Sequence, residues 1–142
     1  MEGLGLEPYA GSLRWYFHQE QPLEDWQALL LQFLEQLGLA CTAGDKRVLG
    51  HIKCLARLSP GGYIRGSKIS VAYPADVEVK GNTATSFAEM QLTLNILVYG
   101  LPHHETQLIV QTVGSAIAAS QQGKIEILTT TSHHEHQHDH HE

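Results

Sequence analysis

Residues 87–99 read FAEMQLTLNILVY, and hydrophobic side chains alternate with polar ones along this stretch. Successive side chains of a β-strand point to opposite faces of its sheet, so the pattern predicts a strand with one buried face and one solvated face. The buried face is expected to carry Ala88, Met90, Leu92, Leu94, Ile96 and Val98, and the solvated face Glu89, Gln91, Thr93 and Asn95.

Four other segments carry strand signals. Residues 12–18 and residues 48–58 alternate in the same way, which predicts two more half-buried strands. Residues 63–79 are rich in β-branched side chains but contain a glycine and a proline, which predicts one bent strand or two short ones. Residues 124–128 predict a short last strand. The side chains expected to face the core are Leu13, Trp15 and Phe17 in the first segment and Ile52, Cys54, Ala56 and Leu58 in the second.

Two segments predict helices. From Pro22 to Gly38, hydrophobic residues recur every three or four positions, as in a helix that packs one side on a core. Proline is favourable at a helix start and glycine at a helix end. The second predicted helix runs from Pro102 to about Ser120, and Gly123 follows it. Its inward side is expected to carry Leu108, Ile109, Thr112, Val113, Ala116 and Ile117.

The order of these segments is strand, helix, two or three strands, helix, strand. It predicts an α+β protein, a ferredoxin-like or related two-layer sandwich in which two helices cover one face of a mainly antiparallel sheet. We expect a single domain at residues 11–128. An N-terminal segment, residues 1–10, precedes it, and a disordered His-rich tail, residues 129–142, follows it.

The charge balance argues against nucleic acid as a partner. The chain has 9 Lys and Arg residues against 15 Asp and Glu residues, and its largest basic cluster is the pair Lys46 and Arg47, so it lacks the cationic stripe that phosphate backbones require. No run of eighteen apolar residues and no signal-like N-terminus is present, which predicts a cytoplasmic protein without a membrane span. Cys41 and Cys54 form no CxxC pair, so neither a disulfide framework nor a cysteine zinc site is expected.

The last ten residues hold the strongest chemical signal. Neutral imidazole is a good ligand for zinc, nickel and cobalt, and carboxylates add further ligands. We therefore predict that the tail binds one of these divalent metals through several overlapping ligand sets. An engineered purification tail and a polar extension without a metal role are the alternatives. The predicted ligands are His133, His134, His136, His138, His140 and His141, with Glu135 and Asp139 as secondary ligands.

His103 and His104 form a second, weaker metal candidate at the start of the second predicted helix. They could bind a metal together with a residue from another loop, but neighbouring helix positions point about 100° apart, so the two are not expected to hold one ion as a pair. A surface or capping role is the alternative. His18 and His51 are expected to be ordinary solvated or hydrogen-bonded histidines.

No catalytic constellation is evident in the sequence. Residues 61–68 contain three glycines followed by Ser67 and Lys68, but a phosphate-binding loop needs Lys before Ser or Thr and a helix after it. A turn between strands explains these glycines. There is no GxSxG motif and no set of nucleophile, base and orienting residue, so the chain is not expected to be an enzyme.

Four features together resemble a known family. They are residues 49–53 (LGHIK), residues 62–64 (GYI), residues 92–100 (LTLNILVYG) and the terminal His-rich tract. Over residues 10–128 the chain looks like the C-terminal domain of CobW-type GTPases, metallochaperone and cobalamin-related proteins with histidine-rich stretches. The resemblance implies a domain that works beside a GTPase during metal insertion. The family's Walker loop, magnesium-binding Asp, guanine-recognition motif and Cys-containing metal motif are not matched, so GTP hydrolysis is not implied.

These observations lead to one hypothesis and two alternatives. We expect a non-enzymatic metal-handling domain, of metallochaperone or storage type, that binds zinc, nickel or cobalt through its tail and docks a GTPase or client metalloprotein. The first alternative is a protein-interaction or oligomerisation module, a homo-oligomer included, with an incidental tail. The second is a small-molecule-binding enzyme that uses Glu89, Gln91, Thr93 and Asn95 on the solvated sheet face.

Overall fold

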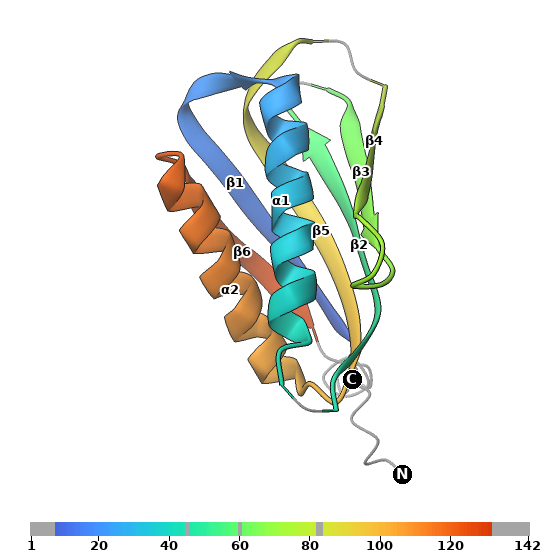
Figure 1. The fold of residues 1–142 in the computed structure, drawn as a ribbon. Coiled ribbons are helices and arrows are strands. Elements are labelled where there is room, and N and C mark those ends of the chain that lie inside the picture. The colour runs from blue at the N-terminus through green and yellow to red at the C-terminus, as the bar shows by residue number, and fades with distance from the viewer. Residues whose placement is uncertain (1–7, 45, 60, 82–83, 132–142) are drawn as a thin grey trace, which may run out of the picture.

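The computed structural model describes residues 8–44, 46–59, 61–81 and 84–131. The elements in chain order are β1 (Tyr9–Pro22), α1 (Leu23–Cys41), β2 (Val48–Leu58), β3 (Tyr63–Lys68), β4 (Asp76–Lys80), β5 (Ser86–Tyr99), α2 (His103–Ser120) and β6 (Lys124–Thr131). The six strands form one sheet of order β4-β3-β2-β5-β1-β6 with all neighbours antiparallel. Both helices lie on the same face of this sheet (Figure 1). The predicted α+β two-layer sandwich is therefore confirmed.

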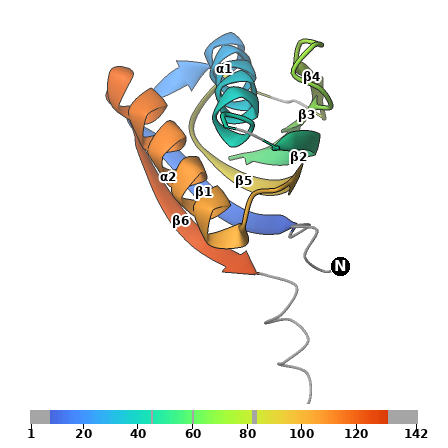
Figure 2. The ribbon, with the colours of Figure 1, turned by 60° about the horizontal axis from the view of Figure 1, so that its bottom comes forward.

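The strand order of the sheet is that of a ferredoxin-like fold with an added hairpin. β5 lies between β1 and β2 and is antiparallel to both, which is the split βαβ arrangement of ferredoxin-like folds. The β3–β4 hairpin widens the sheet beyond β2, so the region of residues 63–79 contains two short strands, one of the two predicted options. Figure 2 shows the sheet curving around α1 and α2.

The helices cover a core of aromatic and aliphatic side chains. Trp15 and Phe33 meet edge to face with ring centroids 5.2 Å apart, and Phe17 and Trp26 do the same at 5.2 Å. The Trp26 indole N–H donates a buried hydrogen bond of 2.9 Å to the Phe87 carbonyl. Trp26 therefore packs its ring against Phe17 and pairs its indole N–H with Phe87. These two contacts hold the first turn of α1 against the start of β5.

The predicted inner faces of the three alternating strands are confirmed with one exception. The exception is Ala88 at the start of β5, which is only half-buried, whereas its neighbour Phe87 is buried. It accompanies a break in the β1–β5 register between Tyr16 and Gln21. A register break changes which face a side chain occupies, so the expectation for Ala88 was wrong. The buried residues are Leu13, Trp15, Phe17, Ile52, Cys54, Ala56, Leu58, Met90, Leu92, Leu94, Ile96 and Val98.

The predicted glycine end of α1 was wrong, because the helix continues through Gly38 to Cys41. Gly38 is buried, and a Cβ there would lie 3.3 Å from Lys68 Cε. Its missing side chain therefore makes room for the buried Lys68. The Lys68 ammonium donates 2.6 Å hydrogen bonds to Glu35 Oε1 and to the Tyr73 carbonyl, which ties the β3–β4 connection to α1.

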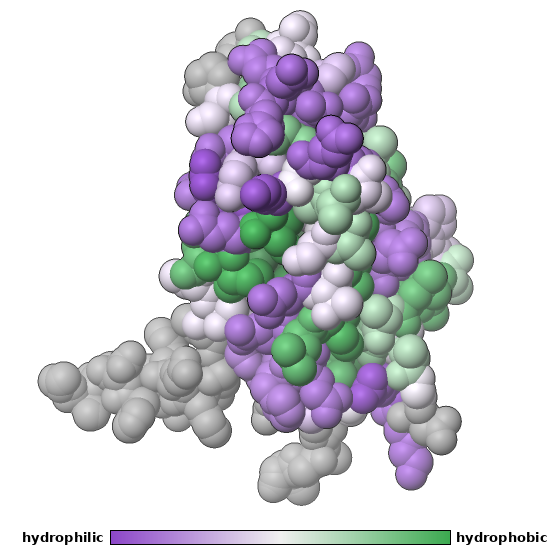
Figure 3. All heavy atoms as spheres, turned by 90° about the vertical axis from the view of Figure 1, so that its left-hand side faces the viewer, coloured by the Kyte–Doolittle hydropathy of each residue, from purple (hydrophilic) through white to green (hydrophobic). Residues whose placement is uncertain are grey.

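The buried side of α2 is rotated from the predicted one. Leu108 is 58% exposed, and Thr112 and Ala116 are exposed as well, whereas Ile117 is buried as expected. The reason is Gly114, where a Cβ would lie 2.7 Å from Ile125 Cδ1, so that this glycine must face the sheet for the helix to pack closely. Figure 3 shows the resulting surface over α2 and β6, in which hydrophobic patches alternate with hydrophilic ones.

The folded unit is longer than predicted at both ends. β1 begins at Tyr9, and β6 continues to Thr131. Pairing of Ala10 with Thr131 and of Gly11 with Thr130 satisfies the backbone there, so residues 129–131 are strand and the predicted tail boundary at residue 129 was wrong. Among the described residues, no helix is long and apolar enough to cross a membrane.

Candidate functional site

The sheet face opposite the helices is polar, as the alternation of residues 87–99 predicted. Strand pairing aligns its outward side chains into rows that run from β5 across β2 and β3 to β4. Three neighbouring rows are Asn95-Lys53-Ser67-Asp76, Thr93-Leu55-Arg65-Glu78 and Gln91-Arg57-Tyr63-Lys80. The register therefore brings residues from four separate strands onto one surface.

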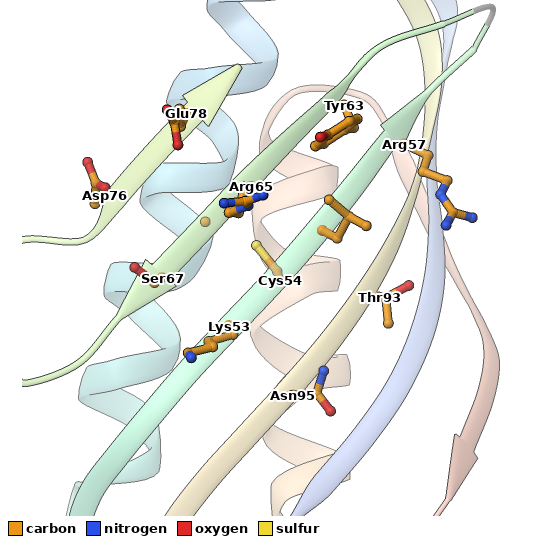
Figure 4. Close-up of a pocket in the computed structure, with 12 residues that line it drawn as sticks. Lys53, Cys54, Arg57, Tyr63, Arg65, Ser67, Asp76, Glu78, Thr93 and Asn95 are labelled. Atoms are coloured by element: carbon orange, nitrogen blue, oxygen red, sulfur yellow. The ribbon is translucent and has the colours of Figure 1, made fainter. Parts of the chain in front are cut away.

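An open depression of about 720 Å³ lies over these rows. Figure 4 views it from the open side, with the helices behind the sheet. We call it the cationic depression, because Lys53, Arg57 and Arg65 all line it. Leu55 lies between Lys53 and Arg57 along β2 and opposite Arg65 on β3. Other polar side chains that line it are Tyr63, Ser67, Asp76, Glu78, Thr93 and Asn95.

The three cations of the depression have no counterion of their own in the described part of the chain. Lys53, Arg57 and Arg65 are exposed, and none of them forms an ion pair or side-chain hydrogen bond with a described residue. Glu78 is the register partner of Arg65 but binds Lys80 on its own strand at 3.2 Å. The lining thus holds three cations against the two carboxylates of Asp76 and Glu78, one of which is already paired, so its net charge is positive.

Arg14, on β1 of the same face, provides a contrast. Its guanidinium lies 3.1 Å from Glu89 and 3.2 Å from Glu126, and it stacks over the Tyr16 ring at 4.1 Å. The neighbouring carboxylates hold the pKa of Arg14 above its usual value, mainly through the hydrogen bond to Glu89. The described fold supplies partners for Arg14 but not for the three cations of the depression.

This arrangement can bind anions, whereas both cysteines are buried. Guanidinium groups bind carboxylates and phosphates through paired N–H donors. Cys54 Sγ faces the core, where burial raises the pKa of its thiol to about 12 and that of Cys41 to about 11. Neither thiol is a ready nucleophile at neutral pH.

The four residues of the enzyme alternative do not form one site. Thr93 and Asn95 line the depression, and Gln91 lies in the next row. Glu89 is instead held by Arg14 outside the depression. The single carboxylate of that alternative therefore lies outside the depression, whose own carboxylates are Asp76 and Glu78.

The predicted metal ligands divide into two groups. The six tail histidines with Glu135 and Asp139 lie outside the described residues. His103 and His104 are the first residues of α2, where His104 is exposed and the His103 ring lies 5.3 Å from the buried Tyr9 ring. Within the described ranges, no three His, Cys, Asp or Glu residues form a group that could hold a metal. His18 is exposed and His51 half-buried.

The alternation of residues 48–58 implies that Lys53 and Arg57 lie on the outer face of their strand, but it does not indicate a site there. The sequence pattern could not assign Arg65 to the same face, because residues 63–79 predicted either one bent strand or two short ones. Only the pairing of Leu55 with Arg65 on one side and with Thr93 on the other brings these residues together. Such cross-strand register depends on long-range contacts.

Comparison with known proteins gives little further information. No family model matches the chain, and no curated protein matches it either, so the resemblance to CobW-type GTPases stays a prediction. Among solved structures, the chain is similar to the crystal structure of AtUAH in complex with glyoxylate, with 13% sequence identity and a TM-score of 0.48. The match covers 91% of this chain but only 30% of that one. At this level the likeness supports no conclusion about fold or function.

Proposed function

We propose that this chain is a non-enzymatic metal-handling domain that binds zinc, nickel or cobalt through its His-rich tail. The observation that carries the proposal is the density of imidazole, because six of residues 133–142 are histidines. Deprotonated imidazole binds these metals, and overlapping ligand sets favour reversible binding over a rigid cage. Reversible binding suits transfer to a client metalloprotein, with or without a GTPase partner.

The way in which β6 ends supports a contribution from α2. Thr131 pairs with Ala10, next to Tyr9, whose ring contacts His103. The Thr130 hydroxyl donates a long 3.4 Å hydrogen bond to Gln107, one helical turn after His103. The end of β6 and the start of α2 accordingly lie at the same end of the fold (Figure 1).

We propose His103 and His104 as fixed ligands that supplement the tail. His133 follows Thr131 by two residues, and two residues of chain span at most about 7 Å. A metal held by early tail histidines can therefore be reached from the start of α2. The tail would supply the ligands from another segment that a histidine at the start of α2 needs. Cys41 and Cys54 are both free and buried, which is compatible with the reducing cytoplasm that we propose as the compartment.

The test is calorimetric zinc titration of the full chain against a chain ending at Ser132, at about pH 7.5 and about pH 5.5. The full chain should bind zinc at the higher pH, and truncation should remove most of this binding. Affinity should fall steeply at the lower pH, because free imidazole has a pKa near 6.5 and must lose its proton to bind metal. Magnesium should bind weakly throughout, because it prefers oxygen ligands.

Controls separate the tail from the helix pair. The truncated chain should unfold with a free energy within about 0.5 kcal/mol of the full chain, because removing polar surface residues leaves the core intact. His103→Ala and His104→Ala should weaken zinc binding. His18→Ala is the control and should not weaken it, because His18 lies on β1 and not at the start of α2. Zinc binding that ignores pH, or that magnesium matches, would show an acidic surface rather than histidine ligation. Undiminished binding in His103→Ala and His104→Ala would restrict the site to the tail.

A further inference from the structure

We infer that the cationic depression is a docking surface for an extended, acidic segment of a partner protein. The inference goes beyond metal binding and rests on described residues alone. Lys53, Arg57 and Arg65 are cations whose charge the described fold leaves uncompensated, while Arg14 on the same face is neutralised by two carboxylates. A partner that supplies carboxylates would complement the first group and not the second.

The spacing of the cations fits an extended chain. Lys53 and Arg57 are four residues apart on β2, which separates their Cα atoms by about 13 Å. Arg65 is the register partner of Leu55, so its Cα lies about 8 Å from those of the other two cations. Alternate residues of an extended segment are about 7 Å apart and point to the same side. Acidic residues two positions before and two positions after a central residue therefore reach Lys53 and Arg57, and the central residue lies level with Leu55 and Arg65.

The centre of the depression favours a peptide over a compact phosphate. Leu55 lies midway between Lys53 and Arg57 on β2 and opposite Arg65, and it is half-buried, as is Tyr63 beside Arg57. A phosphate drawn to all three cations would lie over an apolar side chain that offers it no hydrogen bond. A peptide can instead place an apolar side chain on Leu55 and its carboxylates on the cations.

Acidic residues at the rim limit the direction of the segment. Asp76 and Glu78 lie on the edge strand β4, next to Ser67 and Arg65. They would repel an acidic chain that crosses the sheet toward that edge, so the segment should run along β2 and β3. The same carboxylates, with the net charge of −6, disfavour a nucleic acid backbone, which places charge on every unit.

The experiment measures binding of a fluorescent synthetic peptide, in which Glu alternates with Ser around a central Leu, to the full chain in EDTA. Arg57→Glu and Arg65→Glu should each weaken binding about tenfold or more, because reversal replaces attraction by repulsion. Lys124→Glu is the matched control, since Lys124 is exposed and pairs with Tyr16 outside the depression; it should change affinity less than about twofold. Arg65→Lys should retain most binding.

The outcomes decide between ligands. Binding that Arg57→Glu and Arg65→Glu weaken, and Lys124→Glu spares, supports the inference. Absence of peptide binding, or equal effects of all three reversals, would overturn it. Tripolyphosphate that binds as tightly as the peptide would also overturn it in favour of a small-anion site. Zinc titration of Arg57→Glu should match that of the unchanged protein, so failure of the docking surface and failure of the metal proposal remain distinguishable.

Discussion

The buried Lys68 on the inner face of the sheet and the three cations of the depression on its outer face differ in whether the fold supplies them with partners. On the inner face, the Lys68 side chain is only 3% exposed, and its ammonium is held by the Glu35 carboxylate and the Tyr73 carbonyl. On the outer face, the cationic depression leaves its three cations without partners in the described chain. Lys68 is thus part of the packed structure, whereas the three cations of the depression remain available to a ligand.

The difference has a simple energetic cause. A buried ammonium loses its hydration at a cost of several kcal/mol, so the fold must supply a counterion and hydrogen bonds where water cannot enter. An exposed guanidinium keeps its water and needs no internal partner. The exposed cations without partners therefore contribute little to folding stability, whereas Lys68 and Glu35 depend on each other.

The largest expected effect tests the two faces of β5. Leu94 is fully buried, and Thr93 beside it is exposed. Leu94→Ala should lower the free energy of unfolding by roughly 2–5 kcal/mol, because it removes buried surface and leaves a cavity. Thr93→Ala should stay within about 0.5 kcal/mol of the unchanged protein. Urea denaturation measures both, and similar losses at the two positions would contradict the assignment of the faces.

The next effect tests the buried ion pair. Glu35→Ala should cost roughly 2 kcal/mol of unfolding free energy, because it leaves the Lys68 ammonium buried with only the Tyr73 carbonyl. Lys68→Met should cost less, since Glu35 is 40% exposed and can be solvated by water while Met fills the space. Arg57→Ala is the outer-face control and should have no measurable effect. A larger loss for Lys68→Met than for Glu35→Ala would refute this asymmetry.

The smallest effect is a loss of stability in acid. The hydrogen bond from Lys68, and secondarily that from the Ala75 N–H, hold the pKa of Glu35 below its usual value. The carboxylate therefore stabilises the fold above the pKa of the unfolded chain, near 4.3, and loses this contribution as pH falls through its lower folded pKa. We expect less than about 1 kcal/mol, because solvent screens the exposed side of the carboxylate.

Urea denaturation of Glu35→Gln from about pH 6 to about pH 3 checks the acid effect. The variant should start less stable than the unchanged protein, and the difference should shrink as the pH falls. A difference that stays constant over this range would show that ionisation of Glu35 does not contribute.

The sequence by itself determined the elements and most of the inner face. The alternation in residues 48–58 and 87–99 predicted which side chains are buried, from Ile52 to Val98, because a strand exposes every second residue to the same environment. It also indicated the two helices and the polar outer face. The composition of residues 133–142 carries the metal prediction without any fold, since imidazole chemistry depends on residue type alone.

Tertiary structure decided whatever depends on contacts between distant segments. The sequence predicted a helix end at Gly38, but in the structure this glycine lies inside α1 and makes room for Lys68. Gly114 faces Ile125 on the sheet, and this contact sets the rotation of α2 that leaves Leu108 exposed. The cationic depression arises because β3 pairs with β2 and sets Arg65 opposite Leu55. Local periodicity cannot encode these neighbours, because strand register and helix rotation are fixed by the packing of residues far apart in the chain.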